Sequence, residues 1–218
     1  MKKENVKSLF LGVFMLLAFV LWTFLIKFID VDAIGPDNSQ VGFSHFNRFF
    51  SNLVGVNMKL YHITDFLSLI PLFMIFAFGM VGLFQWFGRK SIIKVDYDIL
   101  ILGGFYIAVL GVYILFEILE LNYRPILING CLEASYPSST TMLSICVFSS
   151  GATFLNTRIK NPTLRKIAVF ASVAFMIFMV LGRIFSGVHW ITDIIGGILL
   201  SFGLILIYQF FINIKKAT

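Results

Sequence analysis

Charged residues are scarce in this chain. Asp, Glu, Lys and Arg make up 13% of its 218 residues, about half the share found in a soluble domain. In contrast, 59% of the residues are hydrophobic and 26 are Phe, and the mean hydropathy is +0.93. The apolar residues form blocks that reach the roughly 20 residues needed to cross a hydrocarbon core. This composition excludes an ordinary soluble domain and predicts an integral membrane protein.

Cysteine and histidine are also rare, with two and three residues respectively. Cys131 falls in an expected loop and Cys146 within an expected helix, so no structural disulfide is predicted. A metal site would have to use His189 and Asp193, but no second histidine stands at a ligand-like spacing. We therefore expect neither a metal ion nor another cofactor.

The apolar blocks predict an all-α fold, a polytopic bundle of about six transmembrane helices forming a single membrane-embedded domain over residues 1–218. The expected spans are Ser8–Phe28, Thr64–Phe87, Asp98–Leu119, Ser138–Leu155, Arg165–Phe185 and Trp190–Ile212. The first block follows a basic start, as in a signal peptide. Because no small-residue cleavage site follows it and it is long enough to span, it is expected to remain as a helix.

The net charge of +6 is explained by topology, because the cations lie in the short loops between apolar blocks. No nucleic-acid partner is expected; the partner is the bilayer. Twelve of the seventeen cations fall on one side, which predicts cytoplasmic N- and C-termini in a cell-membrane protein. These are Lys2, Lys3, Lys7, Arg89, Lys90, Lys94, Arg158, Lys160, Arg165, Lys166, Lys215 and Lys216.

The longest outer segment, residues 29–63, begins with a turn around Gly35 and Pro36. Apolar residues then recur every three or four positions from Phe43 to Val54, which predicts a helix. This helix is expected either to lie in the membrane interface or to pack over the bundle. His45 and His62 in this segment are interpreted as structural.

Ionisable and polar residues on the outer side fall into three groups. They are Glu117, Glu120 and Arg124; the stretch Tyr136 to Thr141; and Arg183, His189 and Asp193. Ionisable groups at membrane depth are costly and usually functional. All three groups are predicted at the same membrane level, which indicates one polar site at the outer ends of four helices.

The residue types in this site favour an oxyanion. Arg124 and Arg183 offer planar forks of donors suited to phosphate oxygens. Ser138 and Ser139 open a predicted helix, where free N–H groups and hydroxyls attract anions. His189 and Asp193 are four residues apart, so the carboxylate can hold one ring nitrogen and leave the other as base or nucleophile.

Each element also has a purely structural interpretation. His189 and Asp193 are compatible with a buried ion pair, and Arg124 with a helical salt bridge to Glu120. A cluster of Ser and Thr at a helix start is typical of a cap. The convergence of all the elements on one place is what favours a site.

The run from Arg183 through His189 to Asp193, with five residues and then three between them, resembles the third signature of the type 2 phosphatidic acid phosphatase superfamily. Arg124-Pro125 is similar to the end of that family's first signature. Pro137-Ser138-Ser139 is similar to the start of the second. The order, the spacing and the placement on six helices agree over nearly the whole chain.

The resemblance implies a lipid phosphatase or phosphotransferase, with a lipid phosphate or a polyprenyl diphosphate, such as undecaprenyl diphosphate, as substrate at the extracytoplasmic face. His189 would attack phosphorus to form a phosphohistidine, and Asp193 would orient the imidazole. Ser138, Ser139 and both arginines, Arg124 and Arg183, would hold the phosphoryl oxygens.

Two positions depart from the family pattern. The first signature begins with Lys where this chain has Glu117, and the second ends in a general-acid His where it has Thr140. Glu117 is expected either to neutralise Arg124 or to replace the missing acid. The departures favour a diphosphate substrate, whose leaving group needs no proton. They also leave open a catalytically silent protein that binds lipid phosphate or assists transport.

Overall fold

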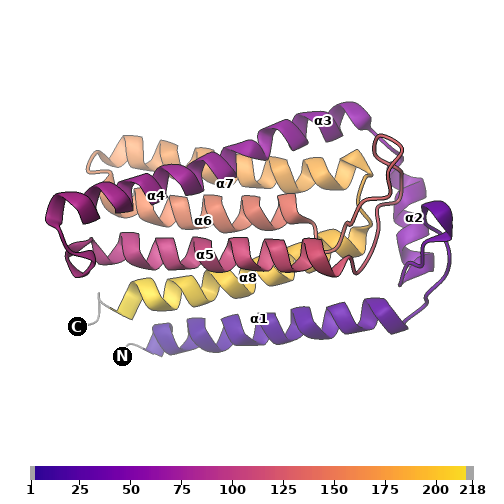
Figure 1. The fold of residues 1–218 in the computed structure, drawn as a ribbon, viewed down its shortest axis with the longest axis horizontal. Helices are drawn as coiled ribbons and strands as arrows, with labels where there is room; N and C mark the ends of the chain where they lie inside the picture. Colours follow the sequence, from indigo (N-terminus) through magenta and orange to yellow (C-terminus); the bar gives the residue numbers. More distant parts are fainter. Residues whose placement is uncertain (1–2, 215–218) are drawn as a thin grey trace.

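The computed structural model describes residues 3–214, and side chains from residue 5. Within these residues the fold is all-α, with only isolated β-bridges in the loops (Figure 1). The helices are α1 (Lys3–Phe28), α2 (Ser44–Val54), α3 (Met58–Leu67), α4 (Leu69–Arg89), α5 (Tyr97–Leu119), α6 (Ser139–Arg158), α7 (Pro162–Ser186) and α8 (Ile191–Ile214).

A helix occupies each of the six predicted spans, with most ends within a few residues of the prediction. The second span differs, because its helical region begins at Met58 rather than Thr64. The Asn57 side chain accepts a hydrogen bond from the Leu60 amide and caps the earlier start. The helical region then breaks at Ser68. Pro71 follows, and proline cannot donate a bond to the carbonyl four residues earlier.

Five helical regions in residues 3–214 are long and apolar enough to cross a membrane, and α6 falls outside them. Its sequence is rich in Ser and Thr, yet most of it is buried. Helices α4, α5, α7 and α8 all pack around α6, so it needs no lipid-facing surface. A hydroxyl-rich helix is therefore stable at the centre of this bundle.

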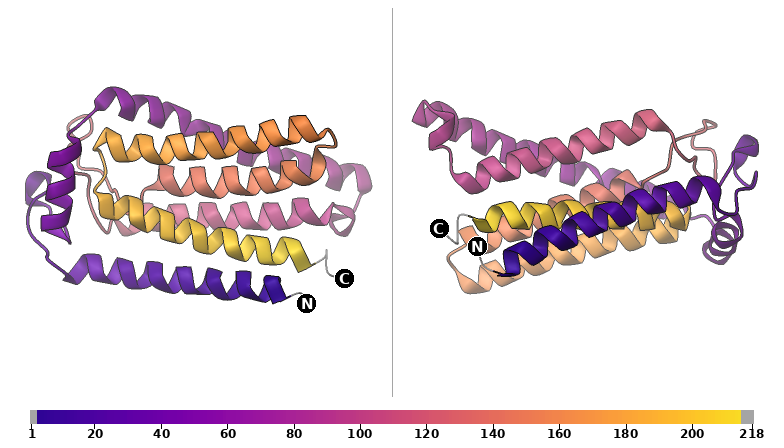
Figure 2. Two further views of the ribbon diagram at one scale, coloured as in Figure 1. Left: turned by 180° about the vertical axis from the view of Figure 1, so that it is seen from behind. Right: turned by 90° about the horizontal axis from the view of Figure 1, so that it is seen from below.

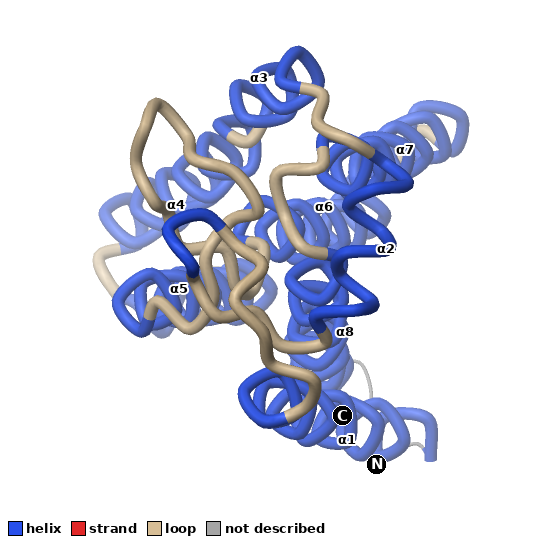
Figure 3. The backbone as a smooth tube through the Cα atoms, turned by 90° about the vertical axis from the view of Figure 1, so that its right-hand side faces the viewer, coloured by secondary structure: helices blue, strands red, loops and turns tan. Residues whose placement is uncertain are grey.

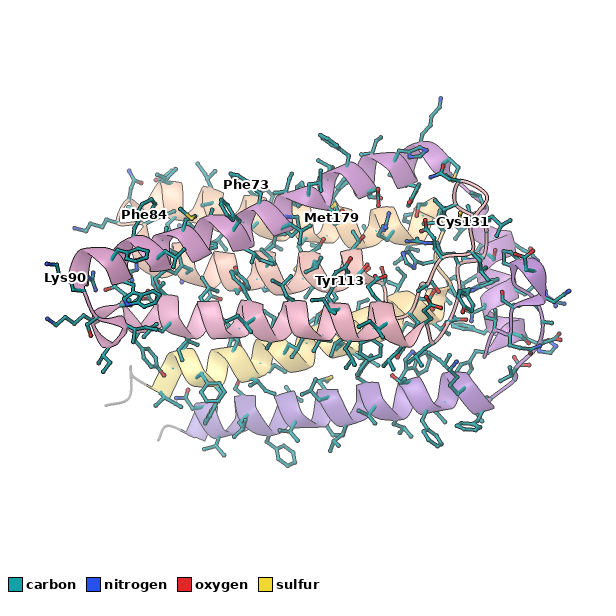
Figure 4. All side chains as sticks on the ribbon, in the orientation of Figure 1. Phe73, Phe84, Lys90, Tyr113, Cys131 and Met179 are labelled. Atoms are coloured by element: carbon teal, nitrogen blue, oxygen red, sulfur yellow. The ribbon has the colours of Figure 1, made fainter. Side chains whose placement is uncertain are left out.

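Large apolar side chains cover the outside of the helices. Phe73 and Phe84 on α4 are about 70% exposed, at 69% and 70%, and both project from the bundle in Figure 4. Such surfaces are stable only in an apolar solvent. The chain is thus a multi-pass membrane protein.

The two ends of the chain lie at the same end of the bundle (Figures 1 and 2). Lys90 lies at that end too, while Cys131 lies at the opposite end (Figure 4). Those of the twelve cations predicted on one side that the structure describes therefore lie at one end of the bundle, as the sequence predicts. Lys2, Lys215 and Lys216 lie outside the described residues. Which end faces the cytoplasm remains a prediction.

Helix α2 crosses the end of the bundle opposite the termini (Figures 1 and 3). Its Asn47 is buried, donates to Thr192 Oγ1 at 3.0 Å, and contacts the start of α8. The predicted helix in the outer segment is present, and it packs over the bundle. Its depth relative to the bilayer remains a prediction.

Candidate active site

His189 is the centre of the polar site. It lies in the short turn between α7 and α8, and its side chain is 1% exposed. Its Nε2 atom lies 3.2 Å from Arg124 Nη1, and its Nδ1 faces Asp193 Oδ2 at 3.7 Å. The guanidinium can only donate, so Nε2 accepts and the ring proton belongs on Nδ1, whose distance from the carboxylate is longer than a hydrogen bond.

Asp193 is fully buried in the first turn of α8. Its Oδ1 accepts from Asn122 Nδ2 and its Oδ2 from the Trp190 amide, both at 3.0 Å. The Ser138 amide donates to the Asp193 backbone carbonyl at 3.1 Å. These bonds fix the carboxylate beside His189 and join the starts of α6 and α8.

Arg124 is positioned by the loop between α5 and α6. Its amide donates to the Glu133 carbonyl at 3.0 Å, and its Nε donates to Glu133 Oε2 at 2.9 Å. The alternative pairing with Glu120 predicted from the sequence is wrong, because the Glu120 carboxylate accepts instead from the Tyr123 hydroxyl at 3.1 Å. Arg124 thus uses Nε for Glu133 and Nη1 for His189.

Arg183 reaches the site from the last turns of α7 and is 1% exposed. Its Nη1 donates to Thr64 Oγ1 at 3.3 Å, and its Nη2 lies 3.6 Å from Asp65 Oδ1. The Tyr61 ring lies 5.1 Å from the Arg183 guanidinium and 5.8 Å from that of Arg124. Helix α3 therefore supplies a wall shared by both arginines.

Sequence reasoning missed Tyr61, Asp65 and Glu133. Tyr61, Thr64 and Asp65 recur at spacings of three and four, which places them on one helix face. This spacing is the signal in the sequence, although hydropathy alone places Thr64 at the start of a span and the preceding residues in a loop.

Ser138 and Ser139 have different surroundings. Ser138 is fully buried, its hydroxyl accepts from the Thr141 amide at 3.5 Å, and its own amide donates to Asp193. Ser138 therefore acts as the helix cap of α6. Among the described hydrogen bonds, the Ser139 and Thr140 amides have no acceptor, which leaves two donors at the helix start for an anion.

A small cavity opens on one side of His189. It has about 10 Å³ of room, enough for one water molecule. Its lining includes His189, Ser139 and Glu117, whereas Thr140, although adjacent in sequence, is buried outside the lining. The cavity thus unites residues from α5, α6 and the α7–α8 turn.

The surroundings of His189 lower its pKa well below its ordinary value of 6.5. The main cause is burial, followed by the positive charges of Arg124 and Arg183. The imidazole is therefore neutral at neutral pH, with the Nε2 lone pair intact. A neutral imidazole is required of a nucleophile.

This lowered pKa makes stability depend on pH. Below about pH 6.5 the unfolded chain binds a proton on His189 that the folded chain excludes, so stability falls as the pH drops. We expect the melting temperature of the wild-type protein in detergent to fall relative to that of His189→Asn between about pH 7.5 and 5. An unchanged difference between the two proteins would contradict the lowered pKa.

Gly187 sets the turn that carries His189. It has a φ of +65°, and an added Cβ would lie 1.8 Å from the Gly55 carbonyl oxygen. Because that neighbour is backbone, Gly187→Ala should cost about 1–3 kcal/mol of unfolding free energy, measured by thermal denaturation in detergent. Gly103→Ala in α5 is the control, since nothing lies within 4 Å of its Cβ position. Equal melting temperatures for the two variants would contradict this account of Gly187.

Comparisons with known proteins identify the family and a similar fold. Residues 73–216 match the family model of the PAP2 superfamily. The crystal structure of a transmembrane PAP2-type phosphatidylglycerolphosphate phosphatase from Bacillus subtilis has a similar fold, with a TM-score of 0.59 and 22% identity. The match covers 95% of this chain and 97% of that one. No curated protein matches the sequence. The chain is therefore a member of the PAP2 superfamily.

Proposed function

We propose that this protein is a lipid phosphatase that hydrolyses a lipid phosphate or polyprenyl diphosphate at the extracytoplasmic face, through a phosphohistidine at His189. The observation that carries the proposal is the buried imidazole of His189, whose Nε2 lies 3.2 Å from Arg124 Nη1 and whose Nδ1 faces Asp193 at 3.7 Å. A histidine serving only as an ion-pair partner would need a raised pKa, and this one is lowered.

The proposed reaction has two steps. Nε2 of His189 attacks phosphorus while the bond from phosphorus to the leaving oxygen breaks, and Asp193 stabilises the imidazolium proton on Nδ1. Water then attacks the phosphohistidine, the phosphorus–nitrogen bond breaks, and inorganic phosphate leaves. Before attack, the guanidinium of Arg124 must move from Nε2 to a phosphoryl oxygen.

The arginines are suited to that exchange. Glu133 and Asp65 place carboxylate oxygens 2.9 Å from Arg124 and 3.6 Å from Arg183. In the proposed complex, phosphoryl oxygens take over these carboxylate contacts in part, with the amides of Ser139 and Thr140 as further donors. Both carboxylates are more exposed than the arginines, so they can withdraw.

The leaving group decides the preferred substrate. An alkoxide must be protonated to leave, while a lipid monophosphate leaving from a diphosphate is already a stable anion. The second-signature position is Thr140, so no imidazole is available there to donate a proton. Loss of a positioned acid costs about 10²–10⁴-fold, which favours a polyprenyl diphosphate over phosphatidate.

The experiment is phosphate release by detergent-purified protein. Undecaprenyl diphosphate, phosphatidylglycerol phosphate and phosphatidate are compared at equal surface concentration in mixed micelles. Phosphatidylglycerol phosphate is included because the structurally similar Bacillus protein is a phosphatase for that lipid. The proposal expects the diphosphate to be fastest. Faster release from phosphatidate would overturn that preference.

A second candidate is a silent binder of lipid phosphates. It is favoured by one observation: of the three histidines, only His189 lies in the site, while His45 pairs with Asp30 and His62 is exposed on α3. Thr140→His distinguishes the two functions. No release by the wild-type protein, with release by Thr140→His, would establish the binder.

A further inference from the structure

Glu117 lies on the last turns of α5 and lines the same cavity as His189. It is the one carboxylic acid in that lining. The other titratable neighbours there are the phenols Tyr113 and Tyr136, whose ordinary pKa is about 10. The Tyr136 hydroxyl is already hydrogen-bonded to Thr23 Oγ1 at 2.6 Å. Of these three groups, the carboxylic acid is the strongest proton donor, which points to Glu117.

The carboxylate of Glu117 is not engaged elsewhere. Among the contacts described for residues 5–214, it forms no hydrogen bond and no salt bridge, whereas Glu120 is bonded to Tyr123 and Glu133 to Arg124. Glu133, at 2.9 Å, is the carboxylate paired directly with Arg124, so Glu117 interacts with that arginine only from a distance. Glu117 is exposed near the end of α5 and has no partner among these contacts.

Thr140 cannot supply the proton itself. An aliphatic hydroxyl is too weak an acid, and Thr140 is buried outside the cavity lining. The site therefore has a nucleophile on one side of the cavity, two free helix-start amides, and a carboxyl group on the facing helix α5.

We propose that Glu117 is the proton donor to the leaving oxygen of lipid phosphate monoesters, replacing only in part the imidazole that the family has at position 140, so that a diphosphate remains the faster substrate. This inference rests on the proposed function of His189. As Nε2 bonds to phosphorus and the ester bond breaks, the Glu117 carboxyl proton passes to the departing oxygen, giving a neutral alcohol. The carboxylate regains a proton from the water that hydrolyses the phosphohistidine.

The test separates proton donation from phosphate binding by changing the leaving group. Release of the organic product in the first turnover is measured by rapid quench for two substrates. With phosphatidylglycerol phosphate the leaving group is an alcohol, and with undecaprenyl diphosphate it is a lipid monophosphate. The variants are Glu117→Gln, His189→Ala and the matched control Glu120→Gln, which makes the same change from carboxyl to amide one turn away.

The proposal expects Glu117→Gln to slow the first turnover of the monoester by about 10²-fold or more and that of the diphosphate by less than about fivefold. Glu120→Gln should change neither. Equal effects of Glu117→Gln on both substrates, or no effect, would overturn the role as proton donor. Tyr113→Phe tests the neighbouring phenol. If this variant alone slows the first turnover of the monoester but not of the diphosphate, the role of Glu117 as proton donor is also overturned.

The same experiment separates the inference from the function on which it rests. If His189→Ala abolishes both reactions and Glu117→Gln is not selective, only the role of Glu117 fails. If His189→Ala retains the wild-type rates, the phosphohistidine mechanism fails and the inference fails with it. A wild-type protein without turnover of either substrate would overturn both.

Discussion

Replacing His189 with alanine should reduce phosphate release by at least about 10³-fold, because the proposed reaction has no other nucleophile. Binding and electrostatic stabilisation by the arginines would remain, but no phosphohistidine could form. The measurement is steady-state phosphate release from undecaprenyl diphosphate by purified protein. The Michaelis constant should change far less than the turnover number, since both arginines stay in place.

His45→Ala is the matched control for this substitution. His45 is exposed at the start of α2 and paired with Asp30, which follows α1, so the same chemical change there should leave turnover within about twofold, as for other surface substitutions. Retention of activity in His189→Ala, or an equal loss in His45→Ala, would contradict the assignment of the nucleophile.

The second large effect is expected for Asp193→Asn, which should lower the turnover number by about 10³–10⁴-fold. The carboxylate accepts from Asn122 on one oxygen and from the Trp190 amide on the other. An amide has one acceptor and one donor, so its NH₂ group must face either an N–H donor or the proton on His189 Nδ1. The imidazole then loses the orientation and tautomer that leave Nε2 free to attack.

This substitution also weakens the fold, because a buried donor without an acceptor costs about 1–3 kcal/mol. Turnover must therefore be measured on the folded fraction, isolated by size-exclusion chromatography and checked by thermal denaturation. A folded Asp193→Asn protein with a wild-type turnover number would show that Asp193 is structural and does not act through His189.

Much of the architecture follows from local properties of the sequence. Block length and hydropathy predict six spans, and the cations of the loops predict that both termini share one end. The convergence of Arg124, His189 and Asp193 also follows from topology, because each stands at the outer end of a predicted helix or turn. These arguments need only the order of the helices along the chain and the fact that consecutive transmembrane helices run in opposite directions across the bilayer.

The partners of the arginines could not be predicted in this way. Glu133 stands in a loop and Asp65 at the start of a predicted span, and their contacts depend on how the α5–α6 loop and helix α3 fold over the bundle. Ser138 likewise resembles a phosphate ligand in sequence, whereas its amide and hydroxyl serve the α6 cap and the carbonyl of Asp193. Tertiary contacts decide which of several polar groups remains free for a ligand.

The central claim is that His189 carries the phosphoryl group during turnover. Purified protein is mixed with undecaprenyl diphosphate labelled at its terminal phosphate, quenched in base within milliseconds, and digested for mass spectrometry. The account predicts an acid-labile, base-stable phosphoryl group on the peptide that contains His189, and none in His189→Ala. Turnover without any labelled intermediate, or a label on another residue, would contradict it.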